Sequence, residues 1–225
     1  VTLTGTSEPG QMVEVTLDGV THSVRTDSTG IWRATYAAGE ITPGTHEAQI
    51  TATITDPAGN TLTRTDSVRV DTEVLNFGVS GAAVEGDDVV NAAEASDGLV
   101  LTGTTEPGGS VTVTFEGTAR AASVDAAGNW TASFTAAEIP AGQYDALVAV
   151  ATTDAAGNTA STTTGFRVDT LVDRLAMSDD PVTADNVVNA AEAAQGVTLA
   201  GVVEAGSQVD VTIGGVVHAA AVDAM

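Results

Sequence analysis

Cysteine is absent from the 225-residue chain, and this absence excludes disulfides, thiolate catalysis and cysteine-ligated zinc together. Lysine and arginine number only 7 against 30 aspartate and glutamate residues, which leaves a net charge of −23. So acidic a chain is unsuited to neutralising phosphate groups, and we expect no binding to nucleic acid or to an anionic membrane surface. No apolar run approaches the ~18–20 residues of a membrane-spanning helix, so we also expect no membrane insertion.

Aromatic residues are scarce as well, at 4% of the chain, although hydrophobic residues make up 43%. The core must therefore be built from valine, alanine, leucine and isoleucine, and the composition is not that of a disordered acidic tail. The sequence contains no glycine-rich phosphate loop, no Ser-His-Asp set and no histidine-rich metal motif. We therefore expect that the protein is not an enzyme.

What the sequence does have is an internal repeat with a spacing of 98 residues. The recurring pieces include Trp32 and Trp130, the run VVNAAEA at 89–95 and 187–193, and the turns Asp56–Asn60 and Asp154–Asn158. We expect three repeats: 1–71, which lacks its first strand, 72–170, which is complete, and 171–225, which is incomplete at its C-terminal end. We interpret the chain as an excerpt of a longer array.

Apolar and polar residues alternate with a period of two inside each repeat. Val111, Val113 and Phe115, for example, alternate with threonine, which is typical of antiparallel strands with one buried face and one wet face. The strands expected in the complete repeat are 73–80, 99–104, 110–115, 119–124, 130–135, 144–154 and 159–169. Seven strands in ~100 residues, with turns every 8–12 residues, predict an all-β fold of tandem immunoglobulin-like β-sandwich repeats. We expect Trp32 and Trp130 in the core, and at most one helical turn, within 89–95.

The order of the recurring pieces resembles a known family. VVNAAEA, LTGTTEPGGSVTV, VDAAGNWTASF, EIPAG, TTDAAGNTAS and FRVDT together are similar to the bacterial Ig-like repeats of giant secreted surface adhesins of the biofilm-associated and RTX types. The resemblance covers essentially the full chain. It implies a structural stalk module that supports cell adhesion or biofilm formation, type I secretion, and a location outside the cell or on the bacterial surface.

The resemblance also implies calcium ions that stiffen the junctions between repeats. The partners it implies are the neighbouring repeats of the same chain, and a host or cell-surface receptor or glycan bound through other domains.

A topological argument from the residues themselves places oxygen ligands at these junctions. If the strands alternate in direction, the turns 105–109, 125–129 and 154–158 lie at one pole, where the chain arrives from the preceding repeat. Carboxylates of two repeats would repel each other there unless a divalent cation lies between them. The expected ligands are Asp71, Glu73, Asp125, Asp154 and Asn158, which share this pole with Glu106, and Asp169 at the next junction. The alternative is ordinary turn chemistry without a metal.

A second acidic group consists of Asp87, Asp88, Asn91 and Glu94. Its spacing across one turn suits the wrapping of an ion, although it lacks the pattern of an EF-hand loop. In the alternative interpretation, Asp87 or Asp88 caps a short helical turn, and Asn91 and Glu94 are solvated or capping residues.

Histidines and exposed aromatic residues offer the remaining candidates. His22 has Arg120 at the equivalent position of the next repeat, so we expect it on an exposed strand face without a catalytic or ligand role. Tyr144 is the best candidate for an exposed aromatic side chain. The alternative function is therefore a carbohydrate- or protein-binding β-sandwich module, or an accessory domain of a secreted enzyme.

Overall fold

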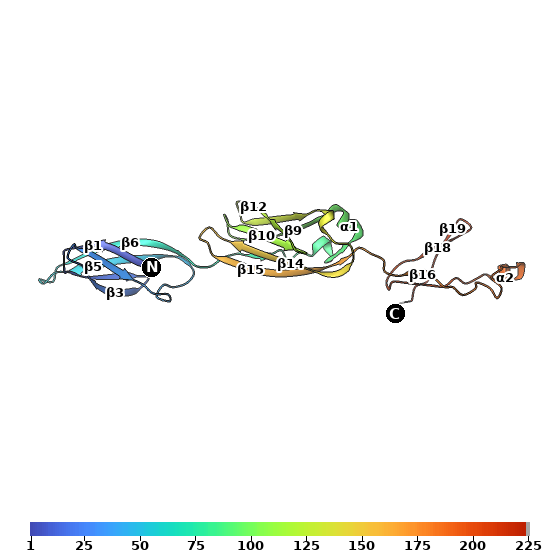
Figure 1. Cartoon of the computed structure of the whole chain (residues 1–225), viewed down its shortest axis with the longest axis horizontal. Helices are drawn as coiled ribbons and strands as arrows, with labels where there is room; N and C mark the ends of the chain where they lie inside the picture. The colour runs from blue at the N-terminus through green and yellow to red at the C-terminus, as the bar shows by residue number, and fades with distance from the viewer. Residues whose placement is uncertain (224–225) are drawn as a thin grey trace.

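The computed structural model describes residues 1–223, and its strands form three groups that follow one another along an elongated molecule (Figure 1). We call them the N-terminal unit (β1, Thr2–Thr6, to β6, Thr61–Asp71), the middle unit (β7, Gly78–Val79, to β15, Thr159–Asp169) and the C-terminal unit (β16, Leu175–Met177, to β19, Val216–Ala219). Within the described residues, no sheet combines strands of two units. The predicted all-β fold is confirmed.

The middle unit is a β-sandwich of two sheets. One sheet has the strand order β11-β10-β14-β15-β8 and the other β12-β13-β9-β7. The strands are β8 (Val89–Asn91), β9 (Leu99–Thr104), β10 (Ser110–Phe115), β11 (Thr118–Ala121), β12 (Ser123–Val124), β13 (Asn129–Phe134) and β14 (Gln143–Thr153). The pairings are antiparallel except that of β8 with β15, which is parallel and departs from the predicted alternation of strand directions.

The core of the middle unit surrounds Trp130, whose side chain is fully buried, as predicted. Its indole Nε1 donates to the carbonyl oxygens of Gly78 at 3.1 Å and Thr104 at 3.2 Å, so the one polar atom of the ring is satisfied. Gly103 lies opposite Trp130 in the strand register, and a Cβ there would overlap the indole ring. This close approach explains why glycine recurs before each tryptophan strand.

The N-terminal unit has the same register in its larger sheet, whose order is β3-β2-β5-β6. Its other strands are β2 (Met12–Leu17), β3 (Val20–Arg25), β4 (Ile31–Thr35) and β5 (Thr45–Thr55). Thr45 pairs with Asp71 at the end of this sheet, as Gln143 pairs with Asp169 in the middle unit. The second sheet consists of β1 and β4, where Trp32 faces Gly5.

The segment between the two units and one later strand depart from the sequence prediction. Of residues 73–80 only β7 pairs as a strand, and the single strand predicted over 119–124 divides into β11 and β12 in different sheets. The stretch that follows β7 forms a 3-10 turn (Val84–Gly86), then β8, then the helix α1 (Ala92–Asp97), which is longer than the one turn predicted. Val90 of β8 is fully buried, so this segment contributes to the core.

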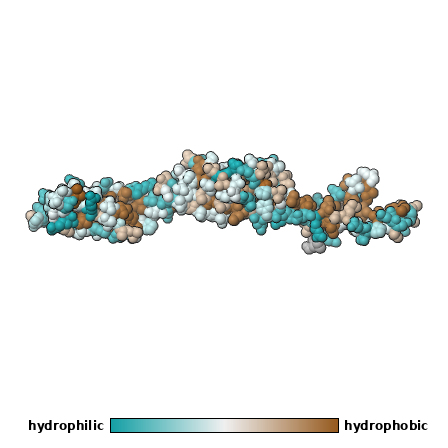
Figure 2. Space-filling model, viewed as in Figure 1, coloured by the Kyte–Doolittle hydropathy of each residue, from teal (hydrophilic) through white to brown (hydrophobic). Residues whose placement is uncertain are grey.

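The C-terminal unit has two strand pairs, β16 with β17 (Gly201–Val203) and β18 (Asp210–Ile213) with β19, and the helix α2 (Ala190–Gln195). Most of its large apolar side chains are exposed, and Figure 2 shows hydrophobic residues at the surface along this part of the molecule. No helix in the described chain is both long enough and apolar enough to cross a membrane.

Candidate cation site at the junction between units

The linker after β6 holds the end of the N-terminal unit against two turns of the middle unit. The backbone N–H of Leu75 donates to Glu106 Oε1 at 2.6 Å. Asn158 Nδ2 lies 3.3 Å from both the carbonyl oxygen and Oδ1 of Asp71. The turns 105–109 and 154–158 therefore meet the arriving chain at one pole of the middle unit.

Three carboxylates converge at this place. One oxygen from each of Asp71, Glu106 and Asp154 lies within 4.8 Å of the other two. Asp71 ends β6, whereas Glu106 belongs to the turn after β9 and Asp154 to the turn after β14. Asp154 is buried, and the other two are half-buried. Two units thus contribute acidic groups to one small volume.

Local turn chemistry fixes the most buried of the three. Asp154 Oδ1 accepts the backbone N–H of Asn158 at 2.8 Å, and Oδ2 accepts Asn158 Nδ2 at 2.7 Å. Gly157 has a φ of +96°, which glycine adopts without strain. This turn directs the Asp154 carboxylate and the Asn158 amide together toward Asp71.

The electrostatics of the group favour a bound cation. Burial by itself raises the pKa of Asp154, but the hydrogen bonds from Asn158 and the turn backbone outweigh it and hold that pKa below its ordinary value. The buried carboxylate is therefore ionised at neutral pH. Partly buried charges of the same sign at this separation repel each other strongly, because solvent screens them less than exposed charges.

The donor set suits a hard divalent cation such as calcium. Every ligating atom that Asp71, Glu106 and Asp154 offer toward the group is oxygen, which is the donor that Ca²⁺ takes, usually six to eight at a time. Asn158, which we also predicted as a ligand, instead presents its amide nitrogen to Asp71 and Asp154. Asp71 Oδ2 also lies 3.2 Å from Arg69 Nη2, so one basic side chain already offsets part of the negative charge.

A family model described as "Bacterial Ig-like domain" matches residues 1–72 and 81–170. The chain belongs to this family. The N-terminal and middle units are accordingly Ig-like units, as the sequence resemblance predicted. No curated protein sequence matches the chain.

Solved adhesin structures are similar to this Ig-like chain. A Ca²⁺-stabilized adhesin that helps an Antarctic bacterium reach out and bind ice is 30% identical over 99% of this chain and 58% of that one, with a TM-score of 0.45. A 1.5-MDa bacterial ice-binding adhesin is 25% identical over 100% of this chain and 76% of that one, with a TM-score of 0.46. A tetra-tandem repeat from the extending region of a large adhesion protein is 22% identical over 97% and 57%, with a TM-score of 0.35. The chain thus spans little more than half the length of the first.

Two residues predicted for the junction lie outside the carboxylate group. Asp125 folds back on its own turn, where its oxygens accept the N–H groups of Ala127 at 2.8 Å and Asn129 at 2.9 Å. Glu73 points back toward Gly44 of the N-terminal Ig-like unit. Glu106, which the sequence placed at the same pole, occupies the position that we expected for them.

The next junction, where Asp169 is the predicted ligand, repeats part of this arrangement. Glu204 takes the place of Glu106: its Oε2 accepts the N–H of Asp173 at 3.2 Å, as Glu106 accepts that of Leu75, and its Oε1 also accepts Gln143 Nε2 at 2.8 Å. Asp169 Oδ2 lies 3.5 Å from Arg167 Nη2. Within residues 1–223, Asp169 belongs to no group of three converging carboxylates.

The second predicted acidic group binds its own backbone. Asp88 Oδ1 accepts the N–H of Val84 at 2.8 Å, and Asp87 Oδ1 accepts that of Val89 at 3.0 Å. Asn91 is the N-cap of α1 and forms a reciprocal capping box with Glu94. Asn91 and Glu94 thus take the capping role of the alternative interpretation. Within residues 1–223, the group of three converging carboxylates includes none of Asp87, Asp88 and Glu94.

Two surface assignments made from the sequence were wrong. His22 does not lie on an exposed face: it shares the inward register of Val20 and Val24, and its ring centroid is 4.5 Å from that of Tyr36. Tyr144 is half-buried against the core, and its hydroxyl donates to the carbonyl oxygen of Pro140 at 3.0 Å. An aromatic platform for a sugar is therefore not available at Tyr144.

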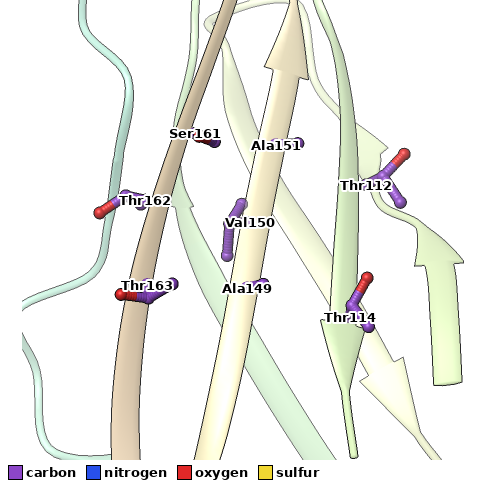
Figure 3. A pocket seen from close by; sticks show the side chains of 8 residues that line it. All are labelled: Thr112, Thr114, Ala149, Val150, Ala151, Ser161, Thr162 and Thr163. Atoms are coloured by element: carbon purple, nitrogen blue, oxygen red, sulfur yellow. The ribbon is translucent and has the colours of Figure 1, made fainter. Parts of the chain in front are cut away.

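A shallow hollow lies on the outer face of the larger sheet of the middle Ig-like unit (Figure 3). Ala149 and Ala151 of β14 form its floor between threonine and serine side chains of β10 and β15. The lining residues are Thr112, Thr114, Ala149, Val150, Ala151, Ser161, Thr162 and Thr163. It contains no charged or aromatic side chain, so it offers little to orient a ligand.

Proposed function

We propose that the chain is a structural, non-catalytic stalk segment of a bacterial cell-surface adhesin, in which Ca²⁺ bridges neighbouring Ig-like units. The proposed units are residues 1–71, 72–170 and 171–225. Membership of a bacterial Ig-like family and the succession of strand units along the molecule support a stalk. Units that contact only their neighbours along the chain suit an extended spacer.

One observation carries the calcium part of the proposal: Asp71, Glu106 and Asp154 converge from two units. These three residues would hold the cation and so connect the end of β6 to both turns of the middle unit, while the Asn158 amide N–H groups hold Asp71 and Asp154 in place. When bound, the cation supplies a positive charge that removes the repulsion between the carboxylates. Without it, the units are joined by the linker and by the hydrogen bonds of Leu75 and Asn158.

Calorimetric titration of Ca²⁺ into the full chain tests this site. Extracellular calcium modules bind with a Kd of roughly 10⁻⁴–10⁻³ M, and we expect a value in that range. Asp71→Asn removes one carboxylate with almost no change of shape and should weaken binding at the junction by at least about ten-fold, since each ligand charge tunes such sites.

Asp66→Asn is the matched control, because Asp66 is an exposed residue of the same strand and the substitution removes the same charge. We expect Asp66→Asn to bind Ca²⁺ like the unaltered chain. Equal affinities in the unaltered chain and Asp71→Asn would contradict the proposed site. A chain that binds no Ca²⁺ at millimolar concentration would contradict the calcium part of the proposal.

The adhesin part of the proposal concerns location. An antibody raised against this chain should label intact cells of the source bacterium, and deletion of the gene should reduce attachment or biofilm mass. Labelling only after cell lysis would contradict a surface location.

A further inference from the structure

A basic side chain, an aromatic ring and a glutamate meet at equivalent positions of the N-terminal and middle units. In the N-terminal unit, His22 Nε2 lies 3.0 Å from Glu40 Oε1, and the imidazole ring contacts Tyr36. In the middle unit, Arg120 pairs with Glu138, and its guanidinium carbon lies 5.7 Å from the centroid of the Phe134 ring. The arrangement is thus the same, but the basic group differs.

In each unit, the glutamate of this group of three side chains accepts a backbone N–H at the start of a loop. Glu40 Oε2 accepts the N–H of Ala37 at 2.6 Å, which closes the start of the loop between β4 and β5. The end of that loop reaches the linker, where the N–H of Gly44 donates to Thr72 Oγ1 at 2.8 Å and the N–H of Thr72 donates to the Gly44 carbonyl at 3.2 Å. The pair therefore connects edge strand β3 to a loop that borders the junction.

We propose that the His22–Glu40 pair is a pH-dependent clamp on the loop 37–44, whereas Arg120–Glu138 is a permanent clamp on the equivalent loop of the middle unit. The loop of the N-terminal unit is held more tightly in mild acid, where the imidazole is charged, than at higher pH, where only a neutral imidazole N–H can donate to Glu40. This inference does not rest on the cation site, because none of its residues belongs to that site.

The direction of the pH effect depends on which partner of the pair changes its charge. An imidazole carries a proton only below about pH 6.5, whereas a guanidinium stays charged at every pH a protein meets. The backbone N–H of Ala37, followed by His22, holds the pKa of Glu40 below its ordinary value of 4.5. The two side chains therefore carry opposite charges only where the imidazole is protonated. Their attraction weakens as the pH rises above mild acid, and it is lost in stronger acid as Glu40 gains a proton.

Other charged groups near the clamp do not replace either partner. The titratable groups that face His22 are Glu40 and Tyr36, and burial followed by the Glu40 charge raises the pKa of Tyr36. Glu14 of β2, Arg25 of β3 and Arg33 of β4 occupy the exposed, outward positions of their strands.

A second histidine pair holds the same loop. Asp18 Oδ2 accepts the N–H of Thr42 at 2.8 Å, and Asp18 Oδ1 lies 3.3 Å from His46 Nε2. The attraction between the charges of these two side chains likewise requires a protonated imidazole. The middle unit has Tyr144 in place of His46, and no histidine faces its loop.

Hydrogen exchange measured by mass spectrometry on the full chain, in the presence of a chelator, tests the clamp. The variants are His22→Arg, which installs the basic residue of the middle unit, and the reciprocal Arg120→His. Comparing variants at one pH removes the pH dependence of chemical exchange itself. At about pH 8, loop 37–44 should exchange about two- to five-fold faster in the unaltered chain than in His22→Arg, the range expected for a partly exposed ion pair, and the two should agree at about pH 5.5. Arg120→His should transfer the same pH dependence to loop 135–142.

Two results would overturn the proposal: equal exchange of loop 37–44 in the unaltered chain and His22→Arg at both pH values, or no pH dependence in Arg120→His.

Discussion

The N-terminal and middle units share their strand register but cover their tryptophans differently. Trp130 is fully buried, whereas Trp32 remains 8% exposed. The difference lies in β7, which pairs with β9 and whose Gly78 carbonyl accepts the indole N–H of Trp130. With the 98-residue repeat, Val1 is equivalent to Leu99, so the positions equivalent to β7 lie before residue 1 and do not cover Trp32 here. The segment that connects two units therefore also completes the core of the unit that follows it.

Truncating the two tryptophans gives the largest expected contrast. Trp130→Ala should lower the free energy of unfolding of the middle unit by ~3–5 kcal/mol, because it leaves a cavity in the core and leaves the Gly78 carbonyl without the indole N–H that donates to it. Trp32→Ala should cost less in the N-terminal unit, since Trp32 is less covered. Thermal unfolding of both variants measures the contrast. Equal losses would mean that β7 adds nothing to the core.

The two facing glycines sharpen the same comparison. Gly103→Ala places a Cβ against both the Trp130 ring and the Gly78 carbonyl, whereas Gly5→Ala meets only the ring of Trp32. We expect ~1–3 kcal/mol of destabilisation at Gly103 and a smaller loss at Gly5, where a side chain and no backbone carbonyl would have to shift. Urea unfolding of each variant distinguishes the two. A larger loss of stability at Gly5 would contradict the role of β7 in covering the tryptophan of the middle unit.

A smaller effect is expected in acid, where Glu138 makes the stability of the middle unit depend on pH. The hydrogen bond from Arg120 and those from Thr135 lower the pKa of Glu138 to about 2. Because the pKa is lowered on folding, Glu138 stabilises the fold above pH ~4.5 and loses this effect as the pH falls toward about 2. Glu138→Gln should therefore flatten the pH dependence of middle-unit stability across that window, and acid titration followed by circular dichroism measures it. An unchanged pH profile would argue against the pair.

The period-two alternation predicts most strands of the sandwich because each strand has one buried and one wet face. The alternation does not predict the inward direction of the side chain at position 22 or at the equivalent position 120. On an edge strand, a histidine or arginine can lie inward while its polar end reaches a glutamate at the rim of the sandwich. The helix α1 depends on Asn91, whose side chain serves equally well as a cap or a ligand in the sequence alone. The residue types alone determine neither the direction of the side chain at position 22 nor the role of Asn91.

The candidate site shows the same limit. The alternation of strands places Asp71 and Asp154 at one pole, but it cannot separate Asp154 from Asp125, since both begin the same Asp-x-x-Gly-Asn turn. The separation depends on which turn faces the arriving β6, and only the packed sandwich determines that. Glu106 is selected for the same reason, through its contact with Leu75.

Small-angle X-ray scattering of the full chain, with saturating Ca²⁺ and with a chelator, tests the central claim most directly. If a cation joins the carboxylates of Asp71, Glu106 and Asp154, the scattering should show a narrower distribution of end-to-end distances with Ca²⁺, and Asp71→Asn should abolish the difference while Asp66→Asn retains it. Identical profiles with and without Ca²⁺ in the unaltered chain would contradict the claim that a cation stiffens this junction.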